Sequence, residues 1–163
     1  MIKVAIVTVS DSSAAGTRAD VSGPALASRV EELGWNVTER RLIPDSTEQL
    51  GKAMAELWDK VDVAVTTGGT GLGPRDITAD FFFAAPYRAI PGFGELMRLE
   101  GRKKTKFADL SRGGAVAYRE TLVLVLPGSP KGAIESLDAV AHLVPHAVDL
   151  LHGRTEHKPK PGA

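Results

Sequence analysis

The stretch VDVAVTTGGTG, residues Val61–Gly71, decides how this sequence folds. Its first part, Val61–Thr67, is a short apolar run rich in β-branched side chains, which predicts a strand. Glycines follow at once and indicate a turn. Two more strands are predicted upstream, IKVAIVTV at Ile2–Val9 and the segment Trp35–Ile43. The nearly continuous apolar character of Ile2–Val9 is typical of a strand buried on both faces of a parallel sheet.

One predicted helix separates each pair of these strands. Ser22 can cap the first helix, Pro24 can begin it and Gly34 ends it. The second helix opens on a capping-box pair, Ser46 and Gln49. Strands that alternate with helices in this way are parallel, because such crossovers are right-handed. The sequence therefore predicts a three-layer α/β/α sandwich with a mostly parallel central sheet, in a single domain.

The second half of the chain adds further elements. A buried strand is predicted at Thr121–Leu126, and Lys131–Leu151 has helical periodicity in which Pro145 should bend or split the helix. The stretch Thr105–Ala117 fits a turn feeding a short strand and a loop equally well. Two more segments are predicted to be helical: Ile77–Ala85 and Pro91–Arg98. We expect residues 1–152 to form the domain and residues 153–163, which lack an apolar pattern, to form a flexible tail.

Composition excludes several classes of protein. The 163 residues are 43% hydrophobic and 25% charged, which is typical of a globular domain and excludes a disordered or fibrous chain. Twenty basic residues balance twenty acidic ones, so no overall field favours nucleic acid. The lack of cysteine excludes disulfides, thiolate catalysis and cysteine-ligated zinc. With no leader and no apolar run long enough for a membrane span, we expect a cytoplasmic protein without membrane or nucleic-acid partners.

The unusual residues of the chain follow the predicted strands. In an open parallel sheet, ligands bind in the crevice outside the carboxyl ends of the strands. Four loops would meet there, and they carry these residues: Ser10 and Asp11, Asp45, Gly68-Gly69-Thr70-Gly71 with Asp76, and Pro127-Gly128-Ser129-Pro130. This convergence predicts one ligand site at that edge of the sheet.

The glycine-rich loop at Gly68–Gly73 has two possible roles. Its backbone N–H groups could hold a phosphate, since a ligand can approach glycine without meeting a Cβ atom. Alternatively, the glycines only relieve crowding in a tight turn. The loop lacks the third glycine of the dinucleotide-binding motif, and the P-loop motif does not occur in the chain, so a Rossmann dehydrogenase or a P-loop kinase is not expected.

Asp76 and Asp45 each have two possible roles as well. Asp76 is either a helix N-cap or a carboxylate that holds Mg²⁺ or orients a substrate. Asp45 is either a turn residue or part of the same site.

Ser129, at the start of a helix, is either a simple cap or part of an anion site at the helix N-terminus. The five basic residues within Arg98–Lys106 form either a solvated face or a positive approach for an anionic ligand. His142 and His146 lack a third ligand for zinc.

Taken with these residues, the chain resembles the MogA/MoaB family of molybdenum cofactor biosynthesis proteins, which includes the G domain of gephyrin. The resemblance extends from about Ile2 to Leu151. It is carried by six motifs in order: Val9-Ser10-Asp11, Leu42-Ile43-Pro44-Asp45, Thr66–Gly71 with Arg75-Asp76-Ile77-Thr78, Pro91-Gly92-Phe93-Gly94-Glu95 with Met97-Arg98, Leu110-Ser111-Arg112, and Leu126–Lys131. The TTGGTG form and the loop from Gly16 to Pro24 are more similar to the MogA branch. Ala79-Asp80 departs from the family pattern, which usually has Pro-Glu there.

The resemblance implies an ATP- and Mg²⁺-dependent molybdopterin adenylyltransferase, usually a homotrimer, that could hand its product to a molybdenum-insertion protein. It implies that Asp45 and Asp76 are catalytic and hold the metal. The residues implied to bind the nucleotide and the pterin are Ser10, Asp11, Gly68, Gly69, Thr70, Gly71, Ser111, Pro127, Gly128 and Ser129. Two alternatives are a family member that binds molybdopterin without turnover, as a scaffold, and the related module of competence-damage-type proteins.

Overall fold

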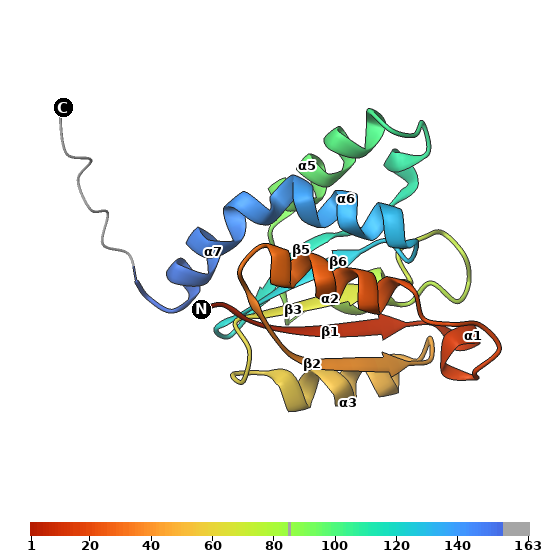
Figure 1. Ribbon diagram of the computed structural model, residues 1–163, viewed down its shortest axis with the longest axis horizontal. Coiled ribbons are helices and arrows are strands. Elements are labelled where there is room, and N and C mark those ends of the chain that lie inside the picture. The colour runs from red at the N-terminus through yellow and green to blue at the C-terminus, as the bar shows by residue number, and fades with distance from the viewer. Residues whose placement is uncertain (85, 155–163) are drawn as a thin grey trace.

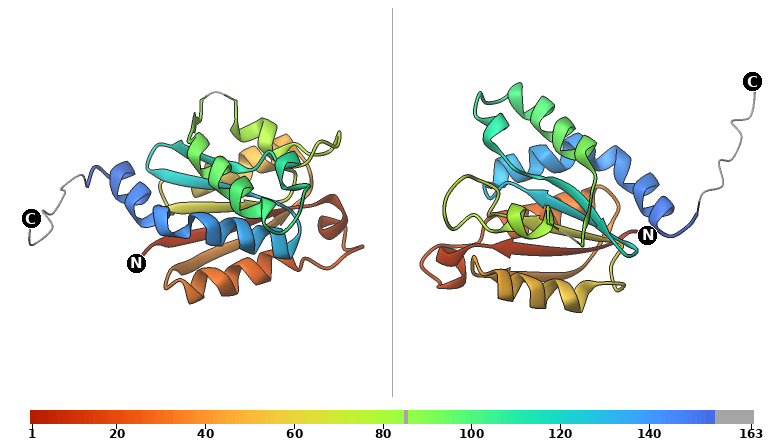
Figure 2. Two further views of the ribbon diagram at one scale, coloured as in Figure 1. Left: turned by 90° about the horizontal axis from the view of Figure 1, so that it is seen from above. Right: turned by 180° about the vertical axis from the view of Figure 1, so that it is seen from behind.

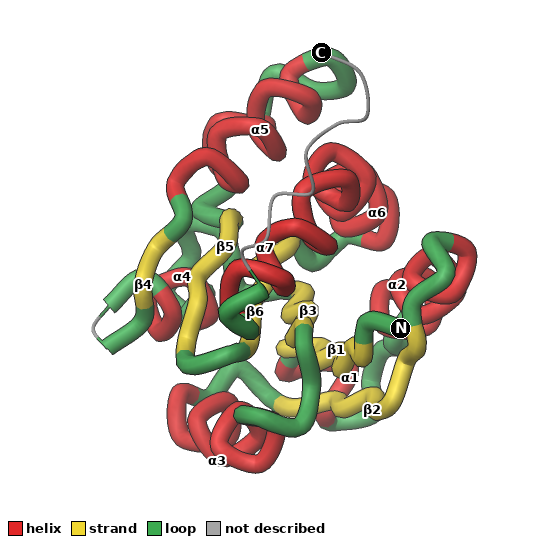
Figure 3. The backbone as a smooth tube through the Cα atoms, turned by 90° about the vertical axis from the view of Figure 1, so that its left-hand side faces the viewer, coloured by secondary structure: helices red, strands yellow, loops and turns green. Residues whose placement is uncertain are grey.

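A six-stranded sheet forms the centre of the protein in the computed structural model, which describes residues 1–84 and 86–154. The strand order is β2-β1-β3-β6-β5-β4 (Figure 3). The β1–β2, β1–β3 and β3–β6 pairs are parallel, and β5 pairs antiparallel with both β4 and β6. The strands are β1 Lys3–Val9, β2 Asn36–Ile43, β3 Val63–Thr67, β4 Arg88–Ala89, β5 Gly114–Tyr118 and β6 Thr121–Leu126. The predicted mostly parallel sheet is confirmed.

Helices cover both faces of this sheet, which completes the predicted three layers (Figures 1 and 2). On one face α2, α5, α6 and α7 share an apolar core with the sheet, and on the other face α3 and α4 do so. The helices are α1 Asp11–Ala14, α2 Ser22–Glu32, α3 Thr47–Leu57, α4 Thr78–Phe82, α5 Pro91–Arg102, α6 Pro130–Val140 and α7 Val144–Leu151, with 3₁₀ turns η1 Ala108–Leu110 and η2 Ala141–Leu143.

The first strand shows why the sequence forms a sheet buried on both sides. Side chains alternate between faces along a strand. Val4 and Ile6 accordingly pack into the core beneath α2 and α6, whereas Ala5 and Val7 pack into the core of α3. All four are at most 1% exposed. Continuous apolar sequence is thus required here, as the pattern of Ile2–Val9 predicted.

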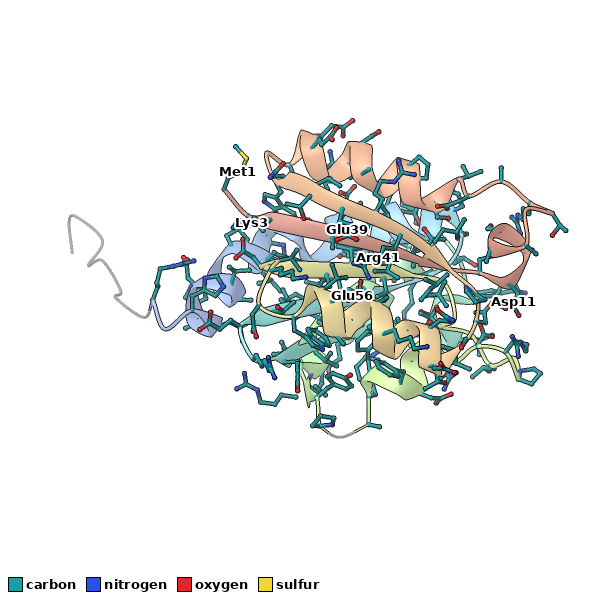
Figure 4. All side chains as sticks on the ribbon, turned by 90° about the horizontal axis from the view of Figure 1, so that it is seen from below. Met1, Lys3, Asp11, Glu39, Arg41 and Glu56 are labelled. Atoms are coloured by element: carbon teal, nitrogen blue, oxygen red, sulfur yellow. The ribbon has the colours of Figure 1, made fainter. Side chains whose placement is uncertain are left out.

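The edge strand β2 differs from β1 because it is mostly exposed. Arg41 on this strand forms ion pairs with Glu39 at 2.6 Å and with Glu56 of α3 at 2.7 Å (Figure 4). Charged side chains on an edge strand disfavour pairing with another chain. Figure 4 also shows the length of β1, with Met1 and Lys3 at one end of the molecule and Asp11 at the other.

Two predicted helix starts have different outcomes. Ser46 caps α3, since its side chain accepts a hydrogen bond from the Gln49 N–H, as the capping-box pair predicted. The predicted cap at Ser22 is wrong, because Val21 is the N-cap residue and Ser22 is already helical. The Ser22 hydroxyl donates instead to the carbonyl of Gly128, at 2.6 Å. It therefore joins the start of α2 to the loop after β6.

Other boundaries were predicted less well. The helix predicted at Ile77–Ala85 is the shorter α4, and Ala85 itself lies outside the described residues. Of the two alternatives for Thr105–Ala117, the turn and short strand is correct for the part that forms β5. The C-terminal helix is split by η2, and Pro145 lies in the first turn of α7. Residues 155–163 of the predicted tail lie outside the described residues.

Candidate active site at the carboxyl ends of the strands

A cavity of about 430 Å³ lies at the carboxyl ends of β1, β3 and β6. The parallel strands point toward this end of the molecule, where α1 also lies (Figure 1). Its volume is within the usual range for small-molecule sites. The predicted site residues that line it are Ser10, Asp45, Gly68, Gly69, Asp76, Gly128 and Ser129. The predicted convergence of four loops is therefore present in the fold.

The remaining predicted residues lie elsewhere. Ser111 and Pro127 line a smaller neighbouring cavity of about 190 Å³, which shares Ser129 with the first. Asp11, Thr70 and Gly71 line neither cavity. The carbonyls of the last two instead accept hydrogen bonds from the backbone N–H and from Nε of Arg112.

Asp11 and Asp45 hold the first two loops together. The backbone N–H of Asp11 donates to Asp45 Oδ2 at 2.8 Å, and the N–H of Asp45 donates to Asp11 Oδ1 at 2.9 Å. Arg75 donates two hydrogen bonds to Asp11 Oδ2, at 2.9 and 2.7 Å, and one to the Asp45 carbonyl at 3.1 Å. The three loops that carry Asp11, Asp45 and Arg75 are thereby fixed relative to one another.

The pKa values of the Asp11 and Asp45 carboxyl groups are shifted in opposite directions. The Arg75 hydrogen bond, together with the N–H of Asp45, lowers the pKa of Asp11. Burial raises the pKa of Asp45, and the negative charges of Asp11 and Asp76 add to this rise. Asp45 is therefore the carboxylate whose ionised form the protein stabilises less, and it faces the cavity.

Asp76 is not the N-cap of α4, because Ile77 occupies that position. Asp76 Oδ2 instead accepts a hydrogen bond from the N–H of Gly73 at 2.8 Å. A Cβ atom on Gly71 or on Gly73 would come within 2.8 Å of the same oxygen. Both glycines thus make room for the Asp76 side chain, and the loop wraps around this carboxylate.

The first two glycines of the loop are required by their own geometry. Gly68 and Gly69 have φ angles of +100° and +69°, which side-chain-bearing residues rarely adopt. A Cβ atom on Gly68 would lie 2.2 Å from the Val9 carbonyl oxygen, and one on Gly69 would lie 2.3 Å from Thr78 Oγ1. Relief of crowding, one of the two predicted roles, is confirmed at these positions. Both glycines also line the cavity, where the Gly68 N–H donates to the Leu126 carbonyl at 3.1 Å.

Ser129 combines the two roles that the sequence left open. Its hydroxyl oxygen accepts a hydrogen bond from the Gly132 N–H at 3.2 Å, so the residue caps α6. It also lines both cavities. The N-terminus of α6 therefore begins at the cavity walls, where its unpaired N–H groups favour an anion.

Asp45 and Asp76 fit a magnesium ion. Within residues 1–84 and 86–154 neither forms an ion pair, and each has one carboxylate oxygen, Oδ1, that accepts no hydrogen bond. Oxygen ligands suit Mg²⁺, which usually takes one or two carboxylates and completes its shell with phosphate oxygens and water. A cation between them would also relieve the repulsion that helps to raise the pKa of Asp45. No group of three or more potential metal ligands occurs in the described residues, so the protein would supply these two.

The smaller cavity has a basic side chain in its wall. Arg98 lines it and donates hydrogen bonds to the carbonyls of Ser111 at 3.2 Å and Gly113 at 3.0 Å. Two other basic residues of the Arg98–Lys106 segment are paired: Arg102 with Asp109, and Lys103 with Glu100. The solvated-face interpretation therefore holds for Arg102 and Lys103, whereas Arg98 faces the cavity.

Sequence reasoning missed part of the larger cavity. Residues 18–21, in the loop before α2, and Ser22 at the start of this helix also line it. Asp20 anchors this loop, because its carboxylate accepts hydrogen bonds from the buried Thr8 hydroxyl and from the Gly23 N–H, both at 3.0 Å. Asp20 belongs to the same long loop after β1 as Asp11, so the strand-end rule could have included it.

These features define a class of protein, an α/β fold with an acidic, glycine-lined cavity at the carboxyl edge of a parallel sheet. Residues 5–146 match the family model described as a probable molybdopterin binding domain. The chain therefore belongs to this family of molybdenum cofactor biosynthesis proteins.

Relatives of the chain have been named more specifically. A molybdopterin adenylyltransferase from Helicobacter pylori is 35% identical over 156 residues, which cover 93% of this chain and 89% of the relative. The molybdopterin adenylyltransferase of Escherichia coli K12 is 34% identical over 171 residues, covering 93% and 86%. The crystal structure of the molybdopterin biosynthesis enzyme MoaB from Thermus thermophilus is 43% identical, with a TM-score of 0.86 and coverage of 94% and 98%. In the described part of the chain, no helix is long and apolar enough to cross a membrane.

Proposed function

We propose that this protein is a molybdopterin adenylyltransferase, which transfers AMP from MgATP to the terminal phosphate of molybdopterin and releases pyrophosphate. One observation carries the proposal. Asp45 and Asp76 come from loops after two different strands, yet they line one cavity together with Gly68, Gly69 and the start of α6. Relatives of this name, 34–35% identical over most of the chain, support it.

The chemistry requires alignment more than activation. A phosphate monoester has a second pKa near 6, so at pH 7 the molybdopterin phosphate is mostly a dianion and no general base is needed. One of its oxygens forms a bond to the α-phosphorus of ATP, the bond from that phosphorus to the bridging oxygen breaks, and pyrophosphate leaves with the electron pair. Bringing two polyanions together in line is the main barrier.

The larger cavity has the groups for this task. The Gly69 N–H and the N-terminus of α6 would donate to phosphate oxygens, and Gly68 lets the ligand approach the backbone closely. Asp45 and Asp76 would hold Mg²⁺, which when bound neutralises charge on the reacting phosphates. Asp11 acts through its paired hydrogen bonds with Asp45. Thr70 and Gly71, which line neither cavity, support the loop.

The smaller cavity is the proposed place for molybdopterin. Ser111 and Pro127 line it, and Ser129 belongs to both cavities. A phosphate group near Ser129 would therefore meet the nucleotide at the boundary between them. Arg98 in the wall offers a positive charge for an anionic ligand.

The direct test is to incubate the purified protein with molybdopterin and MgATP. Adenylylated molybdopterin and one pyrophosphate per product should form, and omission of molybdopterin or of Mg²⁺ should abolish both. Binding of molybdopterin without AMP transfer would replace this proposal with the non-catalytic scaffold. Equilibrium dialysis with molybdopterin alone measures that binding, and the AMP-transfer assay separates the enzyme from the scaffold.

The resemblance also supports three finer proposals. The protein acts as a homotrimer, works in the cytoplasm, and hands its product to a molybdenum-insertion protein. Sedimentation equilibrium of the purified chain tests the first. Mixing the loaded protein with such a partner and following transfer of the adenylylated product tests the last.

A further inference from the structure

Arg112 makes an unusual set of contacts behind the glycine loop. Its Nε donates to the Gly71 carbonyl at 2.8 Å and one terminal nitrogen, Nη2, donates to the Asp76 carbonyl at 2.9 Å. Its backbone N–H donates to the Thr70 carbonyl at 2.9 Å. The other terminal nitrogen pairs with Asp80. One residue thus holds three carbonyls of the segment that carries Asp76.

These contacts differ in how much they are shielded from water. The Asp80 side chain is 69% exposed, and exposed ion pairs contribute little. The hydrogen bonds to Gly71 and Asp76 are partly buried, and a charged donor makes such bonds stronger. The hydrogen bonds to the Gly71 and Asp76 carbonyls, rather than the ion pair with Asp80, therefore account for the structural role of Arg112.

The neighbours of Arg112 belong to the other cavity. Ser111 and Gly113 line the smaller cavity, and Arg98 of α5 holds both of their carbonyls. Arg112 lines neither that cavity nor the larger one, but it lines a third cavity of about 420 Å³ together with Arg98, Ser111 and Gly113. It therefore links the wall of the smaller cavity to the acidic loop of the larger one.

We propose that Arg112 is a positioning residue that fixes Asp76 relative to the smaller cavity, so that the two bound substrates meet in line. The inference rests on the proposed adenylyl transfer. Arginine is required because its planar fork reaches two carbonyls that are five residues apart along the chain. Lysine keeps the charge but has a single terminal nitrogen, so it cannot reproduce this pair of contacts.

The matched variants are Arg112→Lys and Asp80→Asn. Asp80→Asn removes the exposed ion pair and leaves both carbonyl contacts in place, so its kcat and KM should stay within about twofold of wild type. Arg112→Lys should lower kcat by about 10- to 100-fold, since small misplacements of reacting groups have effects of this size. Its KM for ATP should change less than about threefold, because Arg112 lines neither cavity.

Chemical rescue distinguishes positioning from general support of the fold. Millimolar guanidinium should restore part of the kcat of Arg112→Ala, because the free ion can occupy the vacated place between the carbonyls. The same guanidinium should not change kcat of wild type or of Asp80→Asn. Wild-type kcat in Arg112→Lys, or an equal loss in Asp80→Asn, would overturn the proposal.

Hydrogen exchange gives a readout that does not depend on the reaction. Amides of the Gly71–Asp76 segment should exchange faster in Arg112→Lys than in wild type, and Asp80→Asn should match wild type. Equal protection in all three proteins overturns the positioning role even if the wild type transfers AMP. If the wild type transfers no AMP while Arg112→Lys alone loses protection, the proposed function fails and the role of Arg112 in holding the loop stands.

Discussion

The two ends of the sheet use similar residues for different purposes. At the amino end, Asp59 and Arg119 both have positive φ angles, 62° and 51°, and they pair with each other at 2.7 Å. At the carboxyl end, Asp45 and Asp76 form no ion pair within the described residues. Charges that satisfy one another stabilise a turn, whereas carboxylates left facing a cavity cost stability and are available for binding.

The surroundings differ in the same way. At the amino end Trp58, Tyr87 and Tyr118 pack together with ring centroids 4.7 to 5.9 Å apart, and they fill the space near the turn. At the carboxyl end the space is left open as the 430 Å³ cavity. The turn at Asp59 and Arg119 is therefore packed, and the carboxyl end is the candidate binding region.

The sharpest test of this contrast replaces one aspartate at each end. Asp76→Asn should reduce pyrophosphate release with molybdopterin and MgATP by about 10³-fold, because charge stabilisation at the reacting phosphates is lost. The fold should persist, since the amide oxygen can still accept from Gly73. Asp59→Asn should lower stability by less than about 1 kcal/mol and leave turnover unchanged. If Asp76→Asn released pyrophosphate at the wild-type rate, Asp76 would have no role in the mechanism.

Two glycines with positive φ test whether the loop geometry is specific. Gly68→Ala combines a strained φ with a Cβ atom 2.2 Å from a backbone oxygen, so it should lower the free energy of unfolding by about 3–5 kcal/mol. Gly34→Ala has φ +78° but open space around the new Cβ atom, so about 1–2 kcal/mol is expected. Urea unfolding measures both, and equal losses would show that crowding at Gly68 is unimportant.

Asp45→Asn should separate stability from activity. Because folding raises the pKa of Asp45, the ionised carboxylate destabilises the folded state, and this cost is absent below about pH 4, where the group is protonated in both states. The variant should therefore melt at a higher temperature than wild type near pH 7, and the difference should shrink as the pH falls toward 4. Its turnover should be lost. A variant that is less stable than wild type at pH 7 would contradict this account.

The smallest expected effect lies at the amino end. Burial raises the pKa of Tyr87, so the stability linked to its neutral form is present below about pH 10 and is lost as the pH rises through the raised value. Tyr87→Phe should leave stability near pH 7 almost unchanged and make the protein less sensitive to alkali. Thermal melts between pH 8 and 11 measure this, and identical alkaline profiles would exclude Tyr87 as a contributor.

The sequence predicted the first half of the fold well for a physical reason. Buried parallel strands such as Ile2–Val9 need continuous apolar sequence, and Ser46 with Gln49 is a local capping pattern. The short strand β4 escaped prediction because two residues, Arg88 and Ala89, hold too little pattern. It exists only because β5 lies beside it.

The site was predictable in outline but not in its contacts. The rule that ligands bind at strand ends placed Asp45 and Asp76 at one edge, and both line the cavity. No local pattern could show that Gly71 and Gly73 make room for Asp76, or that Arg112 holds the loop from 36 residues away. Such contacts depend on tertiary structure, so they appear only once the chain is folded.

Asp11 and Asp45 exchange hydrogen bonds, so the effects of substitutions at the two positions depend on each other. Each carboxylate holds the other residue's backbone, so replacing either one with alanine, which has no acceptor oxygen, releases both loops. A second replacement has little left to undo, and the double variant should be far milder than the two separate losses imply. Evolution and protein engineers alike would have to change this pair in concert.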